Sequence, residues 1–131
     1  MRNKILIILL FIIFLSFCSN DRFSIIENSN YRLKINKKLG TYAQKQNLWK
    51  EAIFRWKNVI KLAPKNYKAH NNLAVAYESI GDYKNAEKEY KLALKLNNNS
   101  YIKKNYEDFK AMLKNKNNKK SKRGKYEKIQ K

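Results

Sequence analysis

The sequence predicts an all-α protein, a short helical solenoid of two helix–turn–helix repeats and a capping helix, with disordered tails. Three observations lead to this fold class. Large and small apolar residues recur at helical spacing over Tyr67–Ser100, and the same pattern stands 34 residues earlier, over Leu33–Asn66. A further apolar stripe of helical period follows over residues 101–114. Periods of about 20–50 residues are typical of solenoids, in which each unit buries its apolar face against its neighbours.

The chain begins with a segment typical of export signals. Met1–Lys4 is short and basic, and Ile5–Leu15 is an apolar run of 11 residues. This run is shorter than the roughly 20 residues of a membrane-spanning helix. It lies within the about 7–15 residues of a signal-peptide core. We therefore expect residues 1–18 to be a signal peptide that takes no part in the fold.

The single cysteine, Cys18, stands at the end of this segment. Leu15–Cys18 resembles a bacterial lipobox, in which the cysteine becomes the lipidated amino terminus, although Phe17 departs from the small residue usual before it. The resemblance implies that Cys18 carries acyl chains such as palmitate on a lipoprotein of the bacterial cell envelope. Ser19, which is not aspartate, permits delivery to the periplasmic face of the outer membrane. The alternatives are an ordinary signal-peptidase cut after Cys18, or an uncleaved anchor with a buried thiol.

Residues 19–32 are predicted to be a polar tether between the lipid and the domain. Phe23, Ile25 and Ile26 form a small apolar patch in it. This patch either packs on the first helix or lies among lipid headgroups.

The two repeats occupy residues 33–66 and 67–100. Gly81 and Asn47 can adopt the left-handed conformation that ends a helix, and Asp82 can cap the next helix. Pro64 cannot continue a helix and separates the two units. The expected helices, including that of the cap, are Asn30–Gln46, Leu48–Leu62, Tyr67–Ile80, Tyr83–Leu96 and Ser100–Lys114.

This pattern resembles the tetratricopeptide repeat (TPR) family. In the second unit the family positions are filled by Leu73, Ala74, Tyr77, Gly81, Tyr83, Ala86, Tyr90 and Ala93. In the first unit they are filled by Leu39, Gly40, Ala52, Trp56, Val59 and Pro64. His70 stands where the family often has tryptophan, and Asn98 replaces the closing proline of the second unit. The resemblance covers Leu33–Ser100 and implies a TPR-type solenoid that binds other proteins.

Residues 101–114 have the pattern of a capping helix, with one apolar face and one soluble face. Residues 115–131 are almost free of apolar side chains and strongly basic. We expect them to be disordered when free. This tail is either a polybasic arm for anionic lipid or an acidic partner, or a solvated tail without a ligand.

The charge is strongly unbalanced, with 30 basic residues against 10 acidic ones and a net charge of +20. Such a protein attracts polyanions. Lysine supplies 25 of the 30 basic residues, which favours diffuse charge over the forked phosphate recognition typical of arginine. An AT-rich genome would also enrich lysine and asparagine. The export signal argues against nucleic acid as the partner.

The sequence offers no catalytic constellation. There is one histidine, His70, and the three glycines, Gly40, Gly81 and Gly124, form no phosphate-binding loop. One histidine without a nearby cysteine makes no metal site. We therefore expect no enzyme activity, no cofactor, no metal and no small-molecule substrate.

The family resemblance implies a peptide-binding groove on the concave face, lined by the first helix of each unit. The matching positions are Lys34, Lys37, Thr41, Lys45, Lys68, Asn71, Val75, Asn105 and Phe109. Such a basic face suits an extended or acidic peptide, although an ordinary solvated face would show the same lysines. One subfamily grips a terminal carboxylate with five polar residues. Only Lys37 and Asn72 match that motif, which is therefore not supported.

Together these features predict a lipid-anchored TPR adaptor that holds another envelope protein. The combination is similar in outline to BamD, the TPR lipoprotein family of the outer-membrane β-barrel assembly machinery, which has more repeats. The alternative is a secreted or signal-anchored TPR protein whose basic tail binds anionic lipid or cell-wall polymer. A third class is a nucleic-acid-associated protein in which the apolar leader is not an export signal.

Overall fold

The structure is a computed structural model that describes residues 26–129. These residues form five helices and no strand: residues 26–45, α2 (Trp49–Leu62), α3 (Tyr67–Ser79), α4 (Tyr83–Leu96) and α5 (Ser100–Ile129). The predicted signal peptide, Cys18 and the first part of the tether lie outside the described residues. No helix among residues 26–129 is both long and apolar enough to cross a bilayer.

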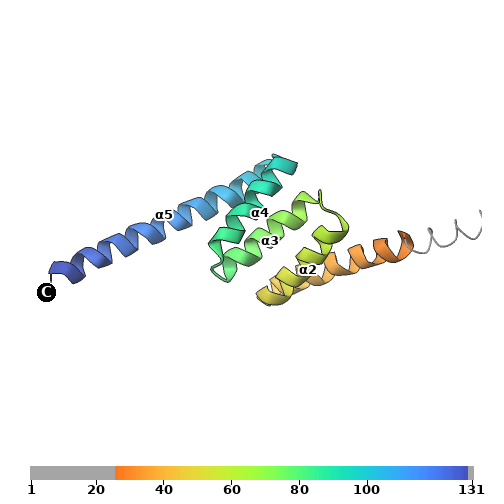
Figure 1. The fold of residues 1–131 in the computed structure, drawn as a ribbon, viewed down its shortest axis with the longest axis horizontal. Helices are drawn as coiled ribbons and strands as arrows, with labels where there is room; N and C mark the ends of the chain where they lie inside the picture. The colour runs from red at the N-terminus through yellow and green to blue at the C-terminus, as the bar shows by residue number, and fades with distance from the viewer. Residues whose placement is uncertain (1–25, 130–131) are drawn as a thin grey trace, which may run out of the picture.

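The helices pack in chain order. Figure 1 shows helix 26–45 beside α2, with α3 and α4 in the middle of the molecule. Helix α5 crosses α4 and extends away from it. The packed pairs include α2 with α3, α3 with α4, and α4 with α5. Helix hairpins that stack on their sequence neighbours define a short solenoid. The all-α helical solenoid predicted from the sequence is therefore confirmed.

Both hairpin turns use the same backbone device. Asn47 (φ 57°) and Gly81 (φ 79°) adopt the left-handed conformation, as the sequence predicts. The next residues, Leu48 and Asp82, donate their backbone N–H to the carbonyl five residues earlier, at 2.8 and 2.9 Å. These hydrogen bonds satisfy carbonyls that the helix end would otherwise leave unpaired. Each hairpin is thus closed by one residue at a fixed position.

Three helices begin at a polar cap. The side chains of Asn66, Asp82 and Asn99 accept the backbone N–H three residues ahead, at 3.1, 3.3 and 3.0 Å. The cap at Asp82 was predicted from the sequence. Pro64 lies in the connection between α2 and α3, as expected of a residue that cannot continue a helix.

Trp56 of α2 is at the centre of the first core. Around it lie small buried residues, Ala43 on helix 26–45, Ala52 on α2 and Ala69 on α3. The indole packs directly on Gly40, where an added Cβ would lie 2.9 Å from Trp56 Cε2. Small residues therefore let three helices approach one another around a single large ring.

The second core is aromatic and involves α5. Tyr90 of α4 and Phe109 of α5 are each only 1% exposed, and their ring centroids lie 5.3 Å apart. Tyr106 and Tyr83 pack beside them at the distances of favourable aromatic pairs. Because α5 covers the apolar side of the second hairpin in this way, it acts as a cap.

The cap follows a register of 33 residues, whereas the predicted register is 34. Three residues connect α4 to α5, but four connect α2 to α3. Asn99 therefore caps α5 as Asn66 caps α3, 33 positions apart. In this register Ile102, Tyr106 and Phe109 occupy the places of Ala69, Leu73 and Ala76, which is why Ile102 and Phe109 are buried.

Two predicted boundaries differ from the structure. Helix 26–45 begins before Asn30, so the end of the expected tether is helical, and Ile26 there is 59% exposed; Phe23 and Ile25 of the predicted apolar patch lie outside the described residues. At the other end, α5 continues past Lys114 to Ile129. Its apolar stripe stops at Leu113, and residues 114–121 are exposed. The extension therefore adds no apolar residue to the core, and the disorder of the free tail stays a prediction.

Candidate protein-binding face

The first helices of the repeats lie side by side. Gln44 Nε2 on helix 26–45 donates to the backbone carbonyl of Asn72 on α3 at 3.3 Å. Asn105 Nδ2 on α5 donates to Asn71 Oδ1 on α3 at 3.0 Å. One side of the molecule is therefore built from helix 26–45, α3 and α5, as the sequence predicts for the groove.

Lysines line this side on its first helix. Residues spaced by three or four share one face of a helix, and the polar residues of helix 26–45 at this spacing are all exposed. They continue across to an exposed lysine at the start of α3, whose Nζ lies 5.9 Å from the Tyr67 ring centroid. We call this set the basic face: Lys34, Lys37, Thr41, Lys45 and Lys68.

The four other predicted groove residues are less accessible. Val75 and Asn105 are half-buried, and Asn71 and Phe109 are only 1% exposed, so these two offer almost no surface to a ligand in this form. Asn71 is covered because α5 packs over it and pairs with it through Asn105. Phe109 belongs to the aromatic core because of the shorter connection before α5.

The same shift in register identifies the residues that α5 does present. Counted 33 positions after Lys68, Asn71 and Val75, they are Tyr101, Lys104 and Asp108, all of which are exposed. Lys104 Nζ lies 2.6 Å from Asp108 Oδ2. On α5 the positive charge of the basic face therefore gives way to an ion pair without net charge.

A cleft of about 420 Å³ lies between the starts of α3 and α5. It is lined by Tyr67, Lys68, Asn71, Asn72, Asn99, Ser100, Tyr101 and Ile102. Of these, the sequence-predicted site contained only Lys68 and Asn71. Tyr67 and Tyr101 were missed, although two tyrosines at the same position of successive 34-residue units are a signal that could have found them.

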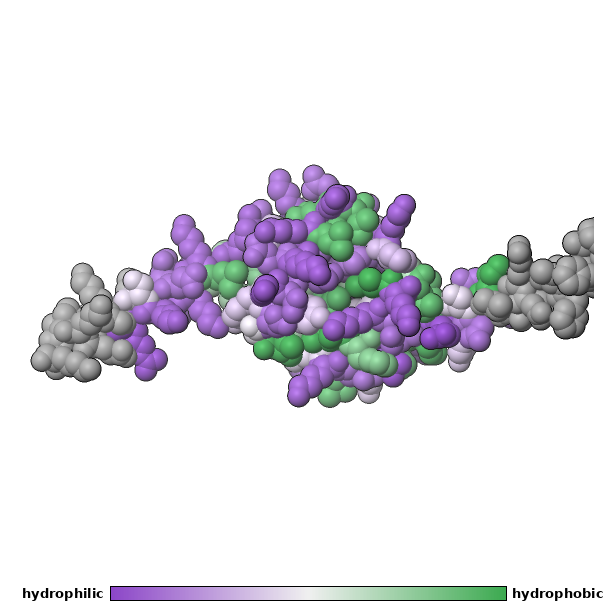
Figure 2. All heavy atoms as spheres, in the orientation of Figure 1, coloured by the Kyte–Doolittle hydropathy of each residue, from purple (hydrophilic) through white to green (hydrophobic). Residues whose placement is uncertain are grey.

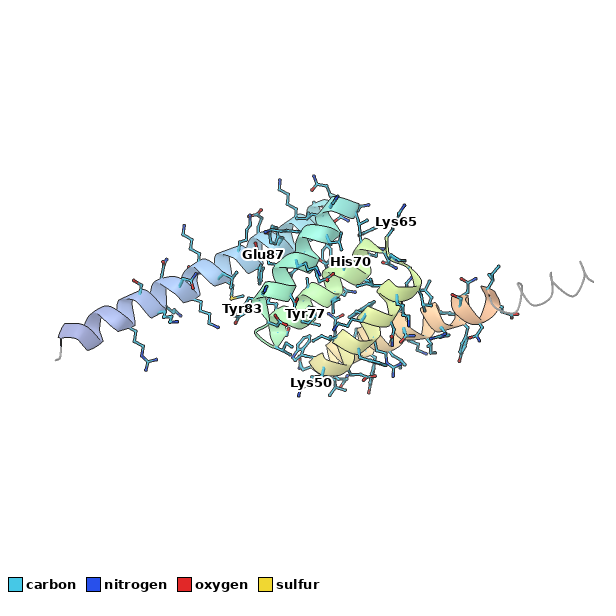
Figure 3. The ribbon with its side chains drawn as sticks, viewed as in Figure 1. Lys50, Lys65, His70, Tyr77, Tyr83 and Glu87 are labelled. Atoms are coloured by element: carbon cyan, nitrogen blue, oxygen red, sulfur yellow. The ribbon has the colours of Figure 1, made fainter. Side chains whose placement is uncertain are left out.

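His70 is a structural residue. It is 3% exposed, its Nδ1 lies 2.6 Å from Glu89 Oε2, and its Nε2 lies 2.9 Å from the carbonyl oxygen of Pro64. Figure 3 shows His70 on the side of α3 that faces α4. Both ring nitrogens therefore join α3 to its neighbours, and neither is open to a ligand.

The perturbed titratable groups lie on α4, away from the basic face. The Tyr90 hydroxyl donates to Glu78 Oε2 at 2.8 Å, and burial together with this bond raises the pKa of Tyr90. On the surface of α4, the hydrogen bond from Lys91 holds the pKa of Glu87 below its ordinary value. Among the described residues, no group of three or more potential ligands could hold a metal ion.

The architecture places the protein in the class of helical solenoids. A row of first helices backed by second helices gives the extended concave surface with which helical solenoids bind other molecules. Figure 2 shows hydrophilic side chains over most of one view, with hydrophobic areas between them on the repeat body.

The family comparison makes this class more definite. Residues 67–100 match the family model described as tetratricopeptide repeat. Repeats of this family are protein–protein interaction modules and are generally non-catalytic adaptors. The first unit lies outside the matched residues, but its hairpin closes on Asn47 as the matched one closes on Gly81. No curated protein matches the chain.

Proposed function

We propose that this chain is a lipid-anchored TPR adaptor of the bacterial cell envelope. It holds an extended, acidic segment of another envelope protein on the basic face. Cys18 attaches it to the membrane, at the periplasmic side of the outer membrane. The chemistry is that of binding, so the residues named have no catalytic role.

The observation that carries the proposal is the exposed row of lysines on helix 26–45, continued by Lys68 on α3. Within residues 26–129, no carboxylate lies within ion-pair distance of any lysine of the basic face. A positive surface without its own counter-charges favours an acidic partner, because complementary charge speeds encounter and rejects like-charged competitors. The helices beneath it are held rigidly by the two cores, which lowers the cost of ordering the site on binding.

The membrane attachment is supported by the position of Cys18. It follows an apolar run of signal-peptide length and stands before the folded part of the chain. The similarity in outline to BamD suggests an outer-membrane protein assembly complex as the setting. Metabolic labelling of cells with a radioactive fatty acid tests the anchor. We expect label in the wild-type chain and none in Cys18→Ala; an unlabelled wild-type chain contradicts the anchor.

The basic face is tested by crosslinked co-purification from intact cells. We expect Lys34→Glu, Lys37→Glu and Lys68→Glu together to lose an envelope protein that the wild type recovers. The matched control reverses three exposed lysines of α4: Lys84→Glu, Lys88→Glu and Lys95→Glu. This control changes the net charge equally and should keep the partner. Equal recovery with both triple variants contradicts binding at the basic face.

A second candidate function rests on α5. Its exposed lysines beyond the packed part of the helix are Lys114, Lys116, Lys119 and Lys120. In this alternative the solenoid is secreted or signal-anchored, and this basic extension binds anionic lipid or cell-wall polymer. Co-sedimentation with anionic vesicles distinguishes the two. Ending the chain after Leu113 should abolish co-sedimentation if the extension binds, and should leave partner recovery unchanged if the basic face binds.

A further inference from the structure

Helix 26–45 carries an apolar stripe that no other helix within residues 26–129 covers. Tyr31, Ile35, Leu39 and Tyr42 are spaced by three, four or seven residues and therefore share one side of the helix. Tyr31 is 64% exposed and Tyr42 is 58% exposed, whereas Ile35 and Leu39 are half-buried. We call this stripe the open end, because it is the uncovered apolar surface at the end of the solenoid opposite α5.

The chain itself shows what such a stripe packs against. The residues of α3 that stand 34 positions after Ile35, Leu39 and Tyr42 share a single environment: they lie in the first core, under α2, and at most 2% of each is exposed. These residues are Ala69, Leu73 and Ala76. In α5, the corresponding Ile102 and Phe109 are 1% exposed. This repeat position is thus covered by a preceding helix in α3 and in α5, and among the described residues it is left open in helix 26–45.

The other end of the solenoid is finished differently. In α3, Ala74 and Tyr77 face the second helix of their unit and belong to the second core. Their counterparts in α5, 33 positions later, are Glu107 and Lys110, which are exposed and form an ion pair at 2.9 Å. A further helix has no apolar surface to pack on there. The open end therefore cannot stack on the α5 end of a second copy.

Basic side chains border the open end on both sides. Lys34, Lys38 and Lys45 flank it on one side and Arg32 on the other, and all four are exposed. The sequence holds no acidic residue from position 28 to position 50. Two open ends placed face to face would bring lysines against lysines, which costs binding energy. The surface instead complements an apolar stripe with acidic borders.

We propose that the open end docks an amphipathic helix of another protein, with apolar residues on its contact side and carboxylates along its edges. The helix would extend the solenoid by occupying the place that α2 occupies against α3. The apolar stripe of this site contains no residue of the basic face, although Lys34 and Lys45 border both surfaces, and the site does not depend on the lipid anchor.

The chain offers the probe for this interaction, because α2 already packs on the equivalent surface of α3. We would label a peptide of the α2 sequence, Trp49–Leu62, that carries Lys50→Glu, Arg55→Glu, Lys57→Glu and Lys61→Glu. The unaltered α2 peptide has the same apolar residues and the opposite charge, so it is the matched control. Fluorescence anisotropy with the full-length chain in mild detergent at low salt measures both. We expect the acidic peptide to bind at least about ten-fold more tightly.

Variants of the chain locate the binding. Tyr31→Ser combined with Tyr42→Ser should weaken binding of the acidic peptide at least about ten-fold, because exposed aromatic residues are frequent anchors of interfaces. Lys38→Glu should weaken it as well, whereas Tyr101→Ser, an equally exposed tyrosine on α5, should not change it. Circular dichroism verifies that each variant is folded.

Several outcomes would overturn the proposal. Equal affinity for the two peptides, or no binding of the acidic one, removes the charge argument. Undiminished binding by the double tyrosine variant places the peptide elsewhere. Sedimentation that shows a dimer lost on the tyrosine substitutions assigns the open end to a second copy. Partition onto anionic vesicles that the same substitutions abolish assigns it to a membrane surface.

Discussion

Gly40 is the residue on which the closest contact of the first core depends. Alanine there gains about 0.5–1 kcal/mol of helix propensity, but its Cβ would lie 2.9 Å from Trp56 Cε2. Overpacking a core costs about 1–3 kcal/mol. We therefore expect Gly40→Ala to lower the free energy of unfolding by about 1 kcal/mol, as measured by urea denaturation.

The control removes the ring. In a Trp56→Leu background the new methyl group has room, so Gly40→Ala should become neutral or stabilising, although Trp56→Leu itself is destabilising. The coupling between the two sites is the quantity that matters in this double-mutant cycle. Additive effects would show that the contact with Trp56 does not determine the residue at position 40.

The two turn residues predict opposite effects of substitution. Asn47 holds a left-handed conformation that glycine adopts without cost, so Asn47→Gly should raise the free energy of unfolding by up to about 1 kcal/mol. Gly81→Ala should lower it by about 1 kcal/mol, since φ there is 79°. Thermal unfolding followed by circular dichroism gives both values. A loss of stability in Asn47→Gly would mean that the asparagine side chain has a further role.

Tyr90 gives the protein a specific sensitivity to alkali. Burial, together with the hydrogen bond to Glu78, raises the pKa of Tyr90 above its ordinary value in the folded state. The folded state therefore favours the neutral phenol. This contribution to stability is fully present below the unfolded pKa, about 10, and is lost as the pH rises above it.

Tyr90→Phe tests this dependence. At pH 7 the variant should be less stable by about 1 kcal/mol, the net contribution of a typical hydrogen bond. Above pH 10 its stability should fall less steeply than that of the wild type. Both proteins carry the same lysines, so the difference between the two curves isolates Tyr90. Parallel curves above pH 10 would contradict the assignment to Tyr90.

At the scale of the helices, the sequence predicts what local chemistry determines. Both left-handed turn residues, the cap at Asp82 and the break at Pro64 follow from residue type alone. The register of α5 does not. Because the connection before α5 is one residue shorter than the one before α3, Phe109 lies in the core and not in the groove, and Asn105 contacts α3. A fixed period of 34 cannot reveal the shorter connection, because each register has its own apolar match: Tyr101 falls on Tyr67 at a spacing of 34, and Ile102 falls on Ala69 at a spacing of 33.

The candidate site likewise has features that one helix determines and features that depend on how helices pack. Lysine spacing on helix 26–45 predicts the exposed row correctly, because exposure there depends on one helix. The burial of Asn71 could not be predicted, because it depends on how closely α5 approaches α3. The open stripe at Tyr31 and Tyr42 is visible only when the same register positions of three packed helices are compared.

The end of α5 is the element with the least support. Lys116 Nζ donates to the Tyr83 hydroxyl at 2.9 Å and lies 4.5 Å from the centroid of that ring. Residues 117–121 beyond it are exposed. An isolated polar helix of this length is marginal in water. We expect fast amide hydrogen exchange beyond residue 117 and slow exchange at Phe109, measured by mass spectrometry. Slow exchange throughout α5 would show that the extension is held by contacts of its own.

For the molecule as a whole, charge opposes folding. The net charge is +20, and a compact state far from neutrality is destabilised by self-repulsion. Apart from His70 with Glu89, the ion pairs of the described residues join positions three or four apart on one helix. Such surface pairs contribute little to stability. Salt therefore screens more repulsion than attraction between helices.

We accordingly expect stability to rise with salt. Sodium chloride at 0.5 M reduces the screening length to below half of its value of about 10 Å at 0.1 M. Compared with 20 mM salt, this should raise the free energy of unfolding by about 1 kcal/mol, which is roughly 4–8 °C in Tm for a domain of this size. Potassium chloride should act equally, because the effect depends on ionic strength. Lys84→Gln with Lys88→Gln and Lys95→Gln should melt higher at 20 mM salt and gain less from added salt. A Tm that falls with salt would mean that attractive charge pairs between helices stabilise the solenoid.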